Sequence, residues 1–438
     1  MQYYSTIGQA DKATLCEAVV NGLAPDGGLY MPERIPTIPK AFFNNISEMS
    51  LADISFVVAN LLFGNDLDSE IINDIIKSAM SFDIPLVNIS ENKYILELFH
   101  GPTLSFKDIG VGFMSRMLTH IYPMPRKDGR IVNILVATSG DAGNAVAHGF
   151  MNIPGTRVFI LYPKDRLNSV QENQVSMSDA TNVVPIEVRG SFDDCQAMVR
   201  NAILDPEINE EMVLTSANSV NVARLMSQCF YYFWAYAQLI RLGVNTDNLV
   251  FSVPSGNLGS LTAGVISKRM GLPVKRFIAS SNSNAVFYDY LKTGIYHPRH
   301  SKATMANVMD VGDPANFTRL LDLYNNNHEK MSSEISGYTY SDEQIKETIY
   351  NTYATNGYVC DPHGAIAYRA LSEGLGNDEI GIALATTHPA KSIDSITPVV
   401  GVNLNMSRQI HKKQSEKRVE CIYPTISALK NILLNSIK

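Results

Sequence analysis

The chain has 438 residues, of which 45% are hydrophobic and 18% are charged. A chain of this length exceeds one compact core, so two or three globular domains are expected. The net charge of −7 argues against nucleic acid as a partner, because phosphate binding requires a basic face. The five cysteines form no CxxC pair, which disfavours a disulfide framework or a zinc–thiolate site and favours the reducing cytoplasm.

The sequence also lacks the signatures of several other protein classes. Its first residues show no signal-peptide pattern, and its longest apolar stretch, residues 229–240, is too short to cross a bilayer. We therefore expect a cytoplasmic protein with no membrane contact. The nine histidines show no metal-ligand spacing, and GxGxxG, Walker A and GxSxG strings are missing. No metal site is expected, and nothing points to dinucleotide, P-loop or hydrolase chemistry.

Along the chain, residues 1–92 predict an N-terminal helical region with Gly- and Pro-marked turns. Short β-prone runs then alternate with helical stretches, which is the signature of an α/β protein with mostly parallel sheets. The expected strands are 94–98, 131–137, 158–161, 183–188, 249–253, 276–279 and 380–385, and the clearest helices are 106–121, 219–240 and 342–353. We expect a smaller α/β domain over 93–215 and a larger one over 216–438, with the chain free to cross between them.

A lysine occupies a special position in the segment His100–Asp108, which reads HGPTLSFKD. Gly101-Pro102 predicts a turn, and Ser105-x-x-Asp108 predicts a capping box that opens a helix. Lys107 would then lie in the first helical turn, where the helix dipole and burial lower an amine pKa. A neutral amine is what Schiff-base chemistry requires. Charge alone leaves open whether Lys107 is instead a solvated surface lysine.

Two similar glycine loops follow predicted strands, Ser139-Gly-Asp-Ala-Gly143 and Ser255-Gly-Asn-Leu-Gly259. Each leads into a helix start, where backbone N–H groups and the helix dipole favour an anion. A single loop of this kind is often only a tight turn. Two of them in one α/β chain indicate a ligand with two anionic groups.

Seven segments together carry a resemblance to the threonine synthase family. They are Tyr3–Thr6, Gly22–Tyr30, His100–Asp108, Ala137–Asp141, Pro254–Asn257, Met309–Pro314 and Thr386–Lys391. The resemblance covers most of the chain and is closer to the bacterial and fungal branch than to plant members with an extended regulatory region. It implies the fold type II architecture of pyridoxal phosphate (PLP) enzymes.

The resemblance also implies residue roles. Lys107 is expected to carry PLP and to be the catalytic residue. The PLP phosphate is expected to bind the loop of Gly256, Asn257, Leu258 and Gly259. Thr386, or alternatively its neighbour Thr387, is expected to meet the pyridine nitrogen. The substrate carboxylate is expected at Ser139, Gly140, Asp141, Ala142 and Gly143, and candidates for the substrate phosphate or carboxylate are Asn218, Asn221 and Arg224.

The implied reaction converts O-phospho-L-homoserine and water to L-threonine and phosphate, the last step of threonine biosynthesis. The expected partner is this small molecule, in a monomer or homodimer. Two alternatives stay open on the sequence. One is another PLP enzyme of the same fold, such as a threonine dehydratase or an O-substituted-serine lyase. The other is a non-catalytic homologue that senses PLP or phosphorylated ligands.

Overall fold

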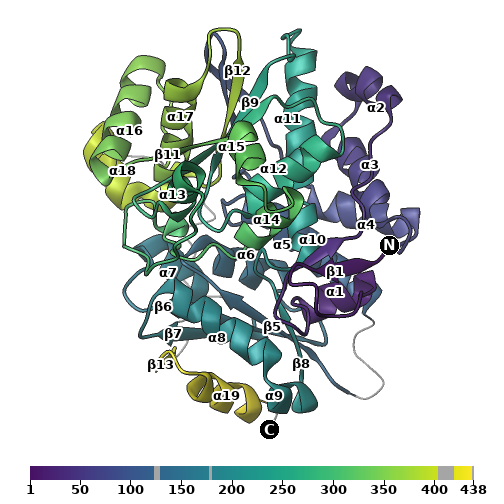
Figure 1. The fold of residues 1–438 in the computed structure, drawn as a ribbon. Coiled ribbons are helices and arrows are strands. Elements are labelled where there is room, and N and C mark those ends of the chain that lie inside the picture. Colours follow the sequence, from purple (N-terminus) through teal and green to yellow (C-terminus); the bar gives the residue numbers. More distant parts are fainter. Residues whose placement is uncertain (123–128, 177–179, 403–418, 437–438) are drawn as a thin grey trace.

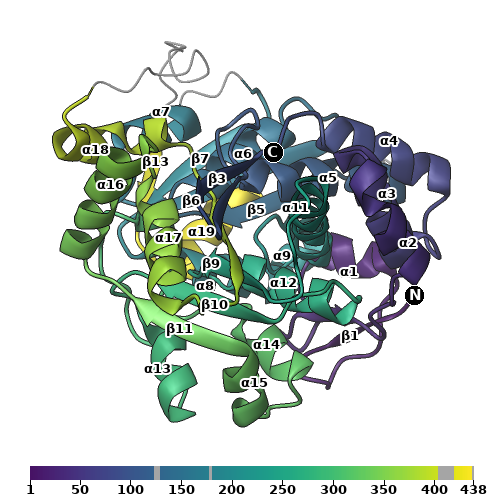
Figure 2. The ribbon, with the colours of Figure 1, turned by 90° about the horizontal axis from the view of Figure 1, so that it is seen from above.

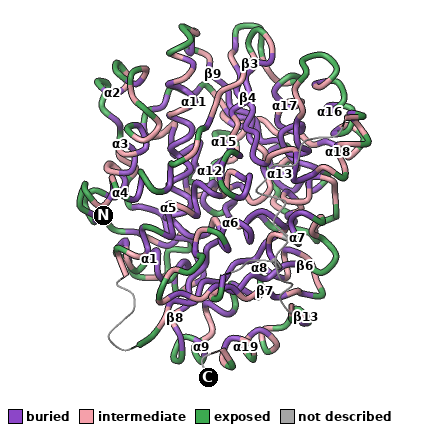
Figure 3. The backbone as a smooth tube through the Cα atoms, turned by 180° about the vertical axis from the view of Figure 1, so that it is seen from behind, coloured by how far each residue is buried: buried purple, intermediate pink, exposed green. Residues whose placement is uncertain are grey.

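Two β-sheets form the framework of the molecule, as the computed structural model in Figure 1 shows. The structure describes residues 1–122, 129–176, 180–402 and 419–436. Burial is concentrated along the strands of both sheets and along helix α5 (Lys107–Ile121), which lies between them (Figure 3). Within the described ranges, no helix is long and apolar enough to span a membrane.

The N-terminal region pairs two short strands and adds four helices. Its elements are β1 (Tyr3–Ser5), α1 (Leu15–Asn21), β2 (Tyr30–Pro32), α2 (Lys40–Asn45), η1 (Ile46–Glu48), α3 (Leu51–Phe63) and α4 (Ser69–Ala79). Capping boxes fix the starts of α1 and α3, because Thr14 and Ser50 exchange hydrogen bonds with the third helical residue. The predicted helical region is therefore present, with a strand pair that the sequence reading missed.

The larger sheet has six strands in the order β11-β10-β9-β12-β4-β3. The strands are β3 (Leu86–Ser90), β4 (Lys93–Glu97), β9 (Leu249–Pro254), β10 (Arg276–Ser281), β11 (Ile335–Thr339) and β12 (Ile380–Ala385). All pairs are parallel except β3–β4, a hairpin. Helices near this sheet include α11 (Cys229–Arg241), α12 (Gly259–Arg269), α13 (Val286–Thr293), α14 (Phe317–Leu323), α15 (His328–Glu334), α16 (Asp342–Asn356), α17 (Pro362–Gly374) and α18 (Ile393–Val400), with the 3-10 turns η2 (Asn307–Met309) and η3 (Pro389–Ser392).

The smaller sheet has five parallel strands in the order β13-β7-β6-β5-β8. They are β5 (Val132–Ala137), β6 (Thr156–Pro163), β7 (Val183–Val188), β8 (Val213–Ser216) and β13 (Glu420–Ile422). The accompanying helices are α6 (Asp141–Gly149), α7 (Ser169–Ser176), α8 (Phe192–Leu204), α9 (Pro206–Glu211), α10 (Val222–Met226) and α19 (Ile426–Asn435). Strand β5 is buried along its whole length, as expected for a strand covered on both faces.

The chain crosses between the two sheets. Residues 93–215 contribute β4 to the larger sheet and β5–β8 to the smaller one, and β13 returns to the smaller sheet from the end of the chain. The predicted helix 219–240 is divided into α10 and α11 at residues 227–228. In Figure 2, helices α2–α4 and α16–α18 lie at opposite ends of the molecule. The loops that follow β5, β9 and β12 supply the cavity described next.

Candidate active site

A cavity lies where loops from both sheets meet. Its walls come from the start of α5, the ends of β5, β9 and β12, and the helices α8, α10 and α17. It is lined by Phe106, Lys107, Ala137, Thr138, Ser139, Ala142, Phe192, Asn218, Ser219, Arg224, Gln228, Pro254, Gly256, Asn257, Leu258, Gly259, Ser260, Val308, Met309, Val311, His363 and Thr386. Carboxyl ends of parallel strands are the usual ligand site of open α/β sheets.

Lys107 is the first residue of α5 and faces this cavity. The predicted capping box is wrong: the helix starts one residue later than a Ser105 cap would require, and Phe106 occupies the cap position. Asp108 instead accepts hydrogen bonds from the backbone N–H and the hydroxyl of Thr103, at 2.9 and 2.6 Å. The lysine still lies at the positive end of the helix dipole, as the sequence predicted.

The amine of Lys107 is easier to deprotonate than that of an ordinary lysine. Burial lowers its pKa to about 8, and the positive charges of Arg224 and Lys391 act in the same direction, against Asp141. At pH 7 roughly a tenth of such amines are neutral. Arg224 is itself buried, with its Nε unpaired among the described residues, and burial lowers its pKa to about 10. A cation with an unused donor beside a partly neutral amine favours an anionic, carbonyl-bearing ligand.

The second glycine loop, residues 255–259, offers open donors to the cavity. Ser255 donates its N–H to Ser280, but the N–H groups of residues 256–259 have no acceptor within the described parts of the chain. Leu258 caps α12 with φ 59°, a left-handed conformation, and it lines the cavity at the helix start, where backbone N–H groups have no intrahelical acceptor. A Cβ added at Gly256 would lie 3.0 Å from Met309 Cα. The loop thus has the form of an anion cradle.

The first glycine loop, residues 139–143, is organised differently. The N–H groups of Gly140 and Gly143 both donate to the Thr138 hydroxyl, at 2.9 Å. Asp141 is fully buried and forms a 2.7 Å ion pair with Lys391, which lowers the pKa of its carboxyl group to about 2 against the opposing effect of burial. Only Ser139 and Ala142 of this loop line the cavity.

The two adjacent threonines at the end of β12 are turned to different sides. Thr386 lines the cavity, and its hydroxyl has no hydrogen-bond partner among the described residues. The Thr387 hydroxyl donates to Asp141 at 2.8 Å and does not line the cavity. Of the two, Thr386 is the one available to a ligand.

The two predicted asparagines also differ in position. Asn218 lines the cavity, but its amide group bridges the N–H and C=O of Ala137, at 3.0 and 2.7 Å. Asn221 is outside the cavity lining; it caps α10 and donates to the Val19 carbonyl at 2.8 Å. Their amide groups therefore hold the backbone around the cavity.

A histidine that no sequence motif marks, His363, also faces the cavity. Nδ1 of His363 lies 2.5 Å from the carboxylate of Asp361, and Nε2 accepts from the N–H of Val308 at 3.2 Å. Asp361 also caps α17. In the sequence, only the Asp-Pro-His string at a helix start indicates that this residue is special. It matches no catalytic motif and does not follow a predicted strand, so the sequence alone does not assign His363 to the site.

These groups fit pyridoxal phosphate. The fit requires donors for a phosphate, an amine for the aldehyde and a hydroxyl near the ring nitrogen, and the cavity has all three in the 255–259 loop, Lys107 and Thr386. The family model described as pyridoxal-phosphate dependent enzyme matches residues 85–386, and the one described as threonine synthase N terminus matches residues 2–80. Fold, site and matches define a PLP-dependent enzyme.

Individual relatives narrow the family further. Threonine synthase of Haemophilus influenzae is 40% identical over 412 residues, 94% of each chain. The crystal structure of threonine synthase from Escherichia coli superposes with a TM-score of 0.93 at 35% identity over 100% of both chains. PLP-bound threonine synthase from Brucella melitensis gives 0.88 at 29% identity over 99% of both chains. The chain belongs to the threonine synthase family. The predicted fold class, PLP dependence and family are thereby confirmed.

Proposed function

We propose that this cavity converts O-phospho-L-homoserine and water to L-threonine and inorganic phosphate, with Lys107 as the residue that carries PLP. The observation that carries the proposal is the position of Lys107, an amine of lowered pKa in one cavity with the open amides of residues 256–259. Membership of the threonine synthase family supports the choice of substrate.

The residue roles follow from which groups are free. Gly256, Asn257, Leu258 and Gly259 hold the cofactor phosphate through backbone N–H groups. Thr386 places its hydroxyl at the pyridine nitrogen. The substrate carboxylate binds at the exposed side of the Ser139–Gly143 loop, where Ser139 and Ala142 line the cavity. Arg224 supplies a positive charge for an anionic group of the substrate.

Bound pyridoxal phosphate supplies an electron sink for negative charge at the substrate Cα. The Lys107 amine takes the Cα proton and then a Cβ proton, phosphate leaves from Cγ, and a proton is returned to Cγ. Water adds at Cβ and Cα is reprotonated, so the net change is water in and phosphate out. Buried Leu258, Met309 and Val311 line the cavity and restrict bulk water around these steps.

The setting of the activity is part of the same proposal. All five cysteines are free thiols, which supports a reducing cytoplasm. The net charge of −7 supports a small-molecule partner in place of nucleic acid. We expect the enzyme to act as a monomer or homodimer.

The test is phosphate release from O-phospho-L-homoserine by purified protein with PLP, alongside a borohydride-reducible PLP adduct. Lys107→Ala should remove the adduct and lower turnover by roughly 10³-fold or more, while Lys292→Ala, an exposed lysine on α13, should retain both. A Lys107→Ala protein with the wild-type adduct would refute the assignment. Formation of 2-oxobutanoate from L-threonine with no phosphate release would favour a dehydratase.

A further inference from the structure

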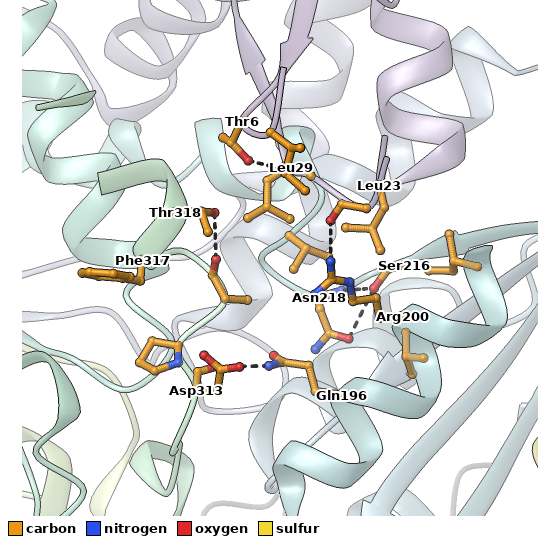
Figure 4. Close-up of a pocket in the computed structure, with 18 of the residues that line it drawn as sticks. Thr6, Leu23, Leu29, Gln196, Arg200, Ser216, Asn218, Asp313, Phe317 and Thr318 are labelled. Carbon is orange, nitrogen blue, oxygen red and sulfur yellow. Dashed lines mark hydrogen bonds between the residues drawn. The ribbon is translucent and has the colours of Figure 1, made fainter. Parts of the chain in front are cut away.

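A second cavity, here called the N-terminal pocket, encloses about 180 Å³ beside the N-terminal segment, α8 and the 313–318 loop (Figure 4). Its apolar walls are Leu23, Leu29, Val199, Ile203 and Val220, each at most 8% exposed. An engineered apolar cavity of about 150 Å³ holds a benzene molecule. The N-terminal pocket therefore has room for an apolar body of roughly five or six carbons.

Opposite charges lie at the edge of these apolar walls. Arg200 is exposed and donates to the Gly27 carbonyl at 3.1 Å; no carboxylate within the described residues pairs with it. Asp313 accepts from the Tyr296 hydroxyl at 2.6 Å. Figure 4 shows Arg200 and Asp313 on different sides of the pocket, with Gln196 next to Asp313. A guanidinium with spare N–H donors at the mouth of an apolar pocket matches a carboxylate with an alkyl tail.

We propose that the N-terminal pocket binds a small branched aliphatic carboxylate, either a free acid or an α-amino acid. The carboxylate bonds to Arg200 and the alkyl group fills the space between Leu29, Val199 and Val220. In the amino acid, Asp313 is the available group for the ammonium. The substrate of the proposed reaction is a poor fit here, because its phosphate ester would lie against the apolar walls of the pocket. Lys107 lines the other cavity and not this one.

The N-terminal pocket is connected to the cofactor loop. Gln196, which lines the pocket, accepts from the Asn257 side chain at 3.1 Å. The N–H of Ala315, another lining residue, donates to the same side chain at 2.6 Å. Asn257 belongs to the proposed phosphate loop, and Asn218 lines both cavities. A ligand that shifts Gln196 or Ala315 changes this loop, so ligand and PLP alter each other's affinity by the same factor.

The experiment is isothermal titration of the PLP-loaded protein with 3-methylbutanoate, L-isoleucine and 3-methylbutylamine. One of the two carboxylates should bind with one-to-one stoichiometry, the tighter one identifying the natural class, and the amine should not bind. Repeating the titration with PLP removed should change the affinity of the bound carboxylate, which tests the connection through Asn257. Turnover is not measured, so this result is independent of the proposed reaction.

Matched variants make the proposal decisive. Arg200→Gln should weaken binding roughly ten- to hundredfold, the expected effect of losing a charge-assisted hydrogen-bond pair, and Arg200→Lys should retain part of the affinity. Arg34→Gln removes an exposed arginine elsewhere and should leave binding unchanged. Absence of binding by both carboxylates at millimolar concentration, equal binding of the amine, or wild-type affinity in a folded Arg200→Gln protein would each overturn the proposal.

Discussion

The loops that follow β5 and β9 share a sequence pattern but differ in their hydrogen bonds and charges. In residues 139–143 the amides of Gly140 and Gly143 are tied to Thr138, and the helix start already holds a carboxylate, Asp141, neutralised by Lys391. In residues 255–259 the amides beyond Ser255 are open and no acidic side chain is present. The first loop carries its own anion, while the second is prepared to receive one.

The sequence predicts the positions of the two loops but not their electrostatics. The glycine pattern correctly predicts that both loops lie at strand ends on one cavity, because that depends on local turn and helix geometry. The pattern does not reveal that the carboxylate of Asp141 is paired with a lysine 250 residues further along the chain, because that ion pair depends on long-range packing. The two loops should therefore respond differently to loss of the buried charge, to substitution of their glycines and neighbouring hydroxyls, and to acid.

The largest effect should come from Asp141→Asn. The change leaves Lys391 as a buried cation with no carboxylate paired to it among the described residues, although its amine still donates to the Thr103 carbonyl at 3.0 Å. Breaking a buried ion pair in this way costs about 3–5 kcal/mol. Urea unfolding of the variant and the wild type at neutral pH measures the loss.

The double variant Asp141→Asn with Lys391→Met is the control for that interpretation. Removing both charges eliminates the uncompensated cation, so the free energy of unfolding should recover part of the loss. If the double variant is the less stable of the two, the first loop does not depend on this charge pair and the contrast between the loops fails.

The second prediction concerns the glycines themselves. Gly256→Val would force the phosphate loop away from Met309, because even a Cβ would lie 3.0 Å from Met309 Cα. Displacing two charge-assisted N–H donors should weaken PLP binding about a hundredfold.

Gly140→Ala is the counterpart in the first loop. Gly140 has φ 143°, and a Cβ there would meet the Gln171 side chain at 2.4 Å, so the loop that faces the substrate should shift. Cofactor content should stay near normal while the apparent substrate affinity falls. PLP occupancy and substrate affinity are measured for both variants, and equal loss of PLP would show that the loops do not divide the work.

The sequence predicted much of this site but not how its parts connect. Lys107, the 255–259 loop and Thr386 meet in one cavity as expected, because each lies beside a recognisable turn, strand end or helix start. His363 was missed, since only the fold brings it to Val308. The assignment of β4 to the larger sheet was also missed, because hydrophobic patterning identifies a strand and not its neighbours.

The third prediction concerns the two hydroxyls at the end of β12: that of Thr386, which lines the cavity, and that of Thr387, which is bonded to Asp141 of the first loop. Thr386→Val should remove the partner proposed for the pyridine nitrogen and cost roughly 1–3 kcal/mol in the affected step, which is about ten- to a hundredfold in rate. Thr387→Val should instead remove the hydrogen bond that the Thr387 hydroxyl donates to Asp141 and lower the free energy of unfolding by about 1 kcal/mol. Cofactor absorbance, turnover and unfolding are compared. If only the Thr387 variant has a disturbed cofactor spectrum, Thr387 and not Thr386 contacts the pyridine nitrogen. If neither variant does, the proposal that a hydroxyl contacts the pyridine nitrogen is wrong.

The smallest effect should be the acid sensitivity that Asp141 gives to the first loop. Its folded pKa, about 2, lies below the ordinary value of 3.8, so the folded state binds fewer protons than the unfolded state as the pH falls. The stabilisation from Asp141 is complete above about pH 4 and is lost as the pH falls through the folded pKa. The shift corresponds to about 2 kcal/mol in total, of which about 1 kcal/mol should be lost by pH 3. Urea unfolding of the wild type and Asp141→Asn from pH 6 to pH 3 measures it: the stability gap between them should narrow by that amount, since the variant lacks the titrating group. A gap that stays constant over this range would mean that Asp141 does not titrate as a buried, paired carboxylate, and the contrast in charge between the two loops would be lost.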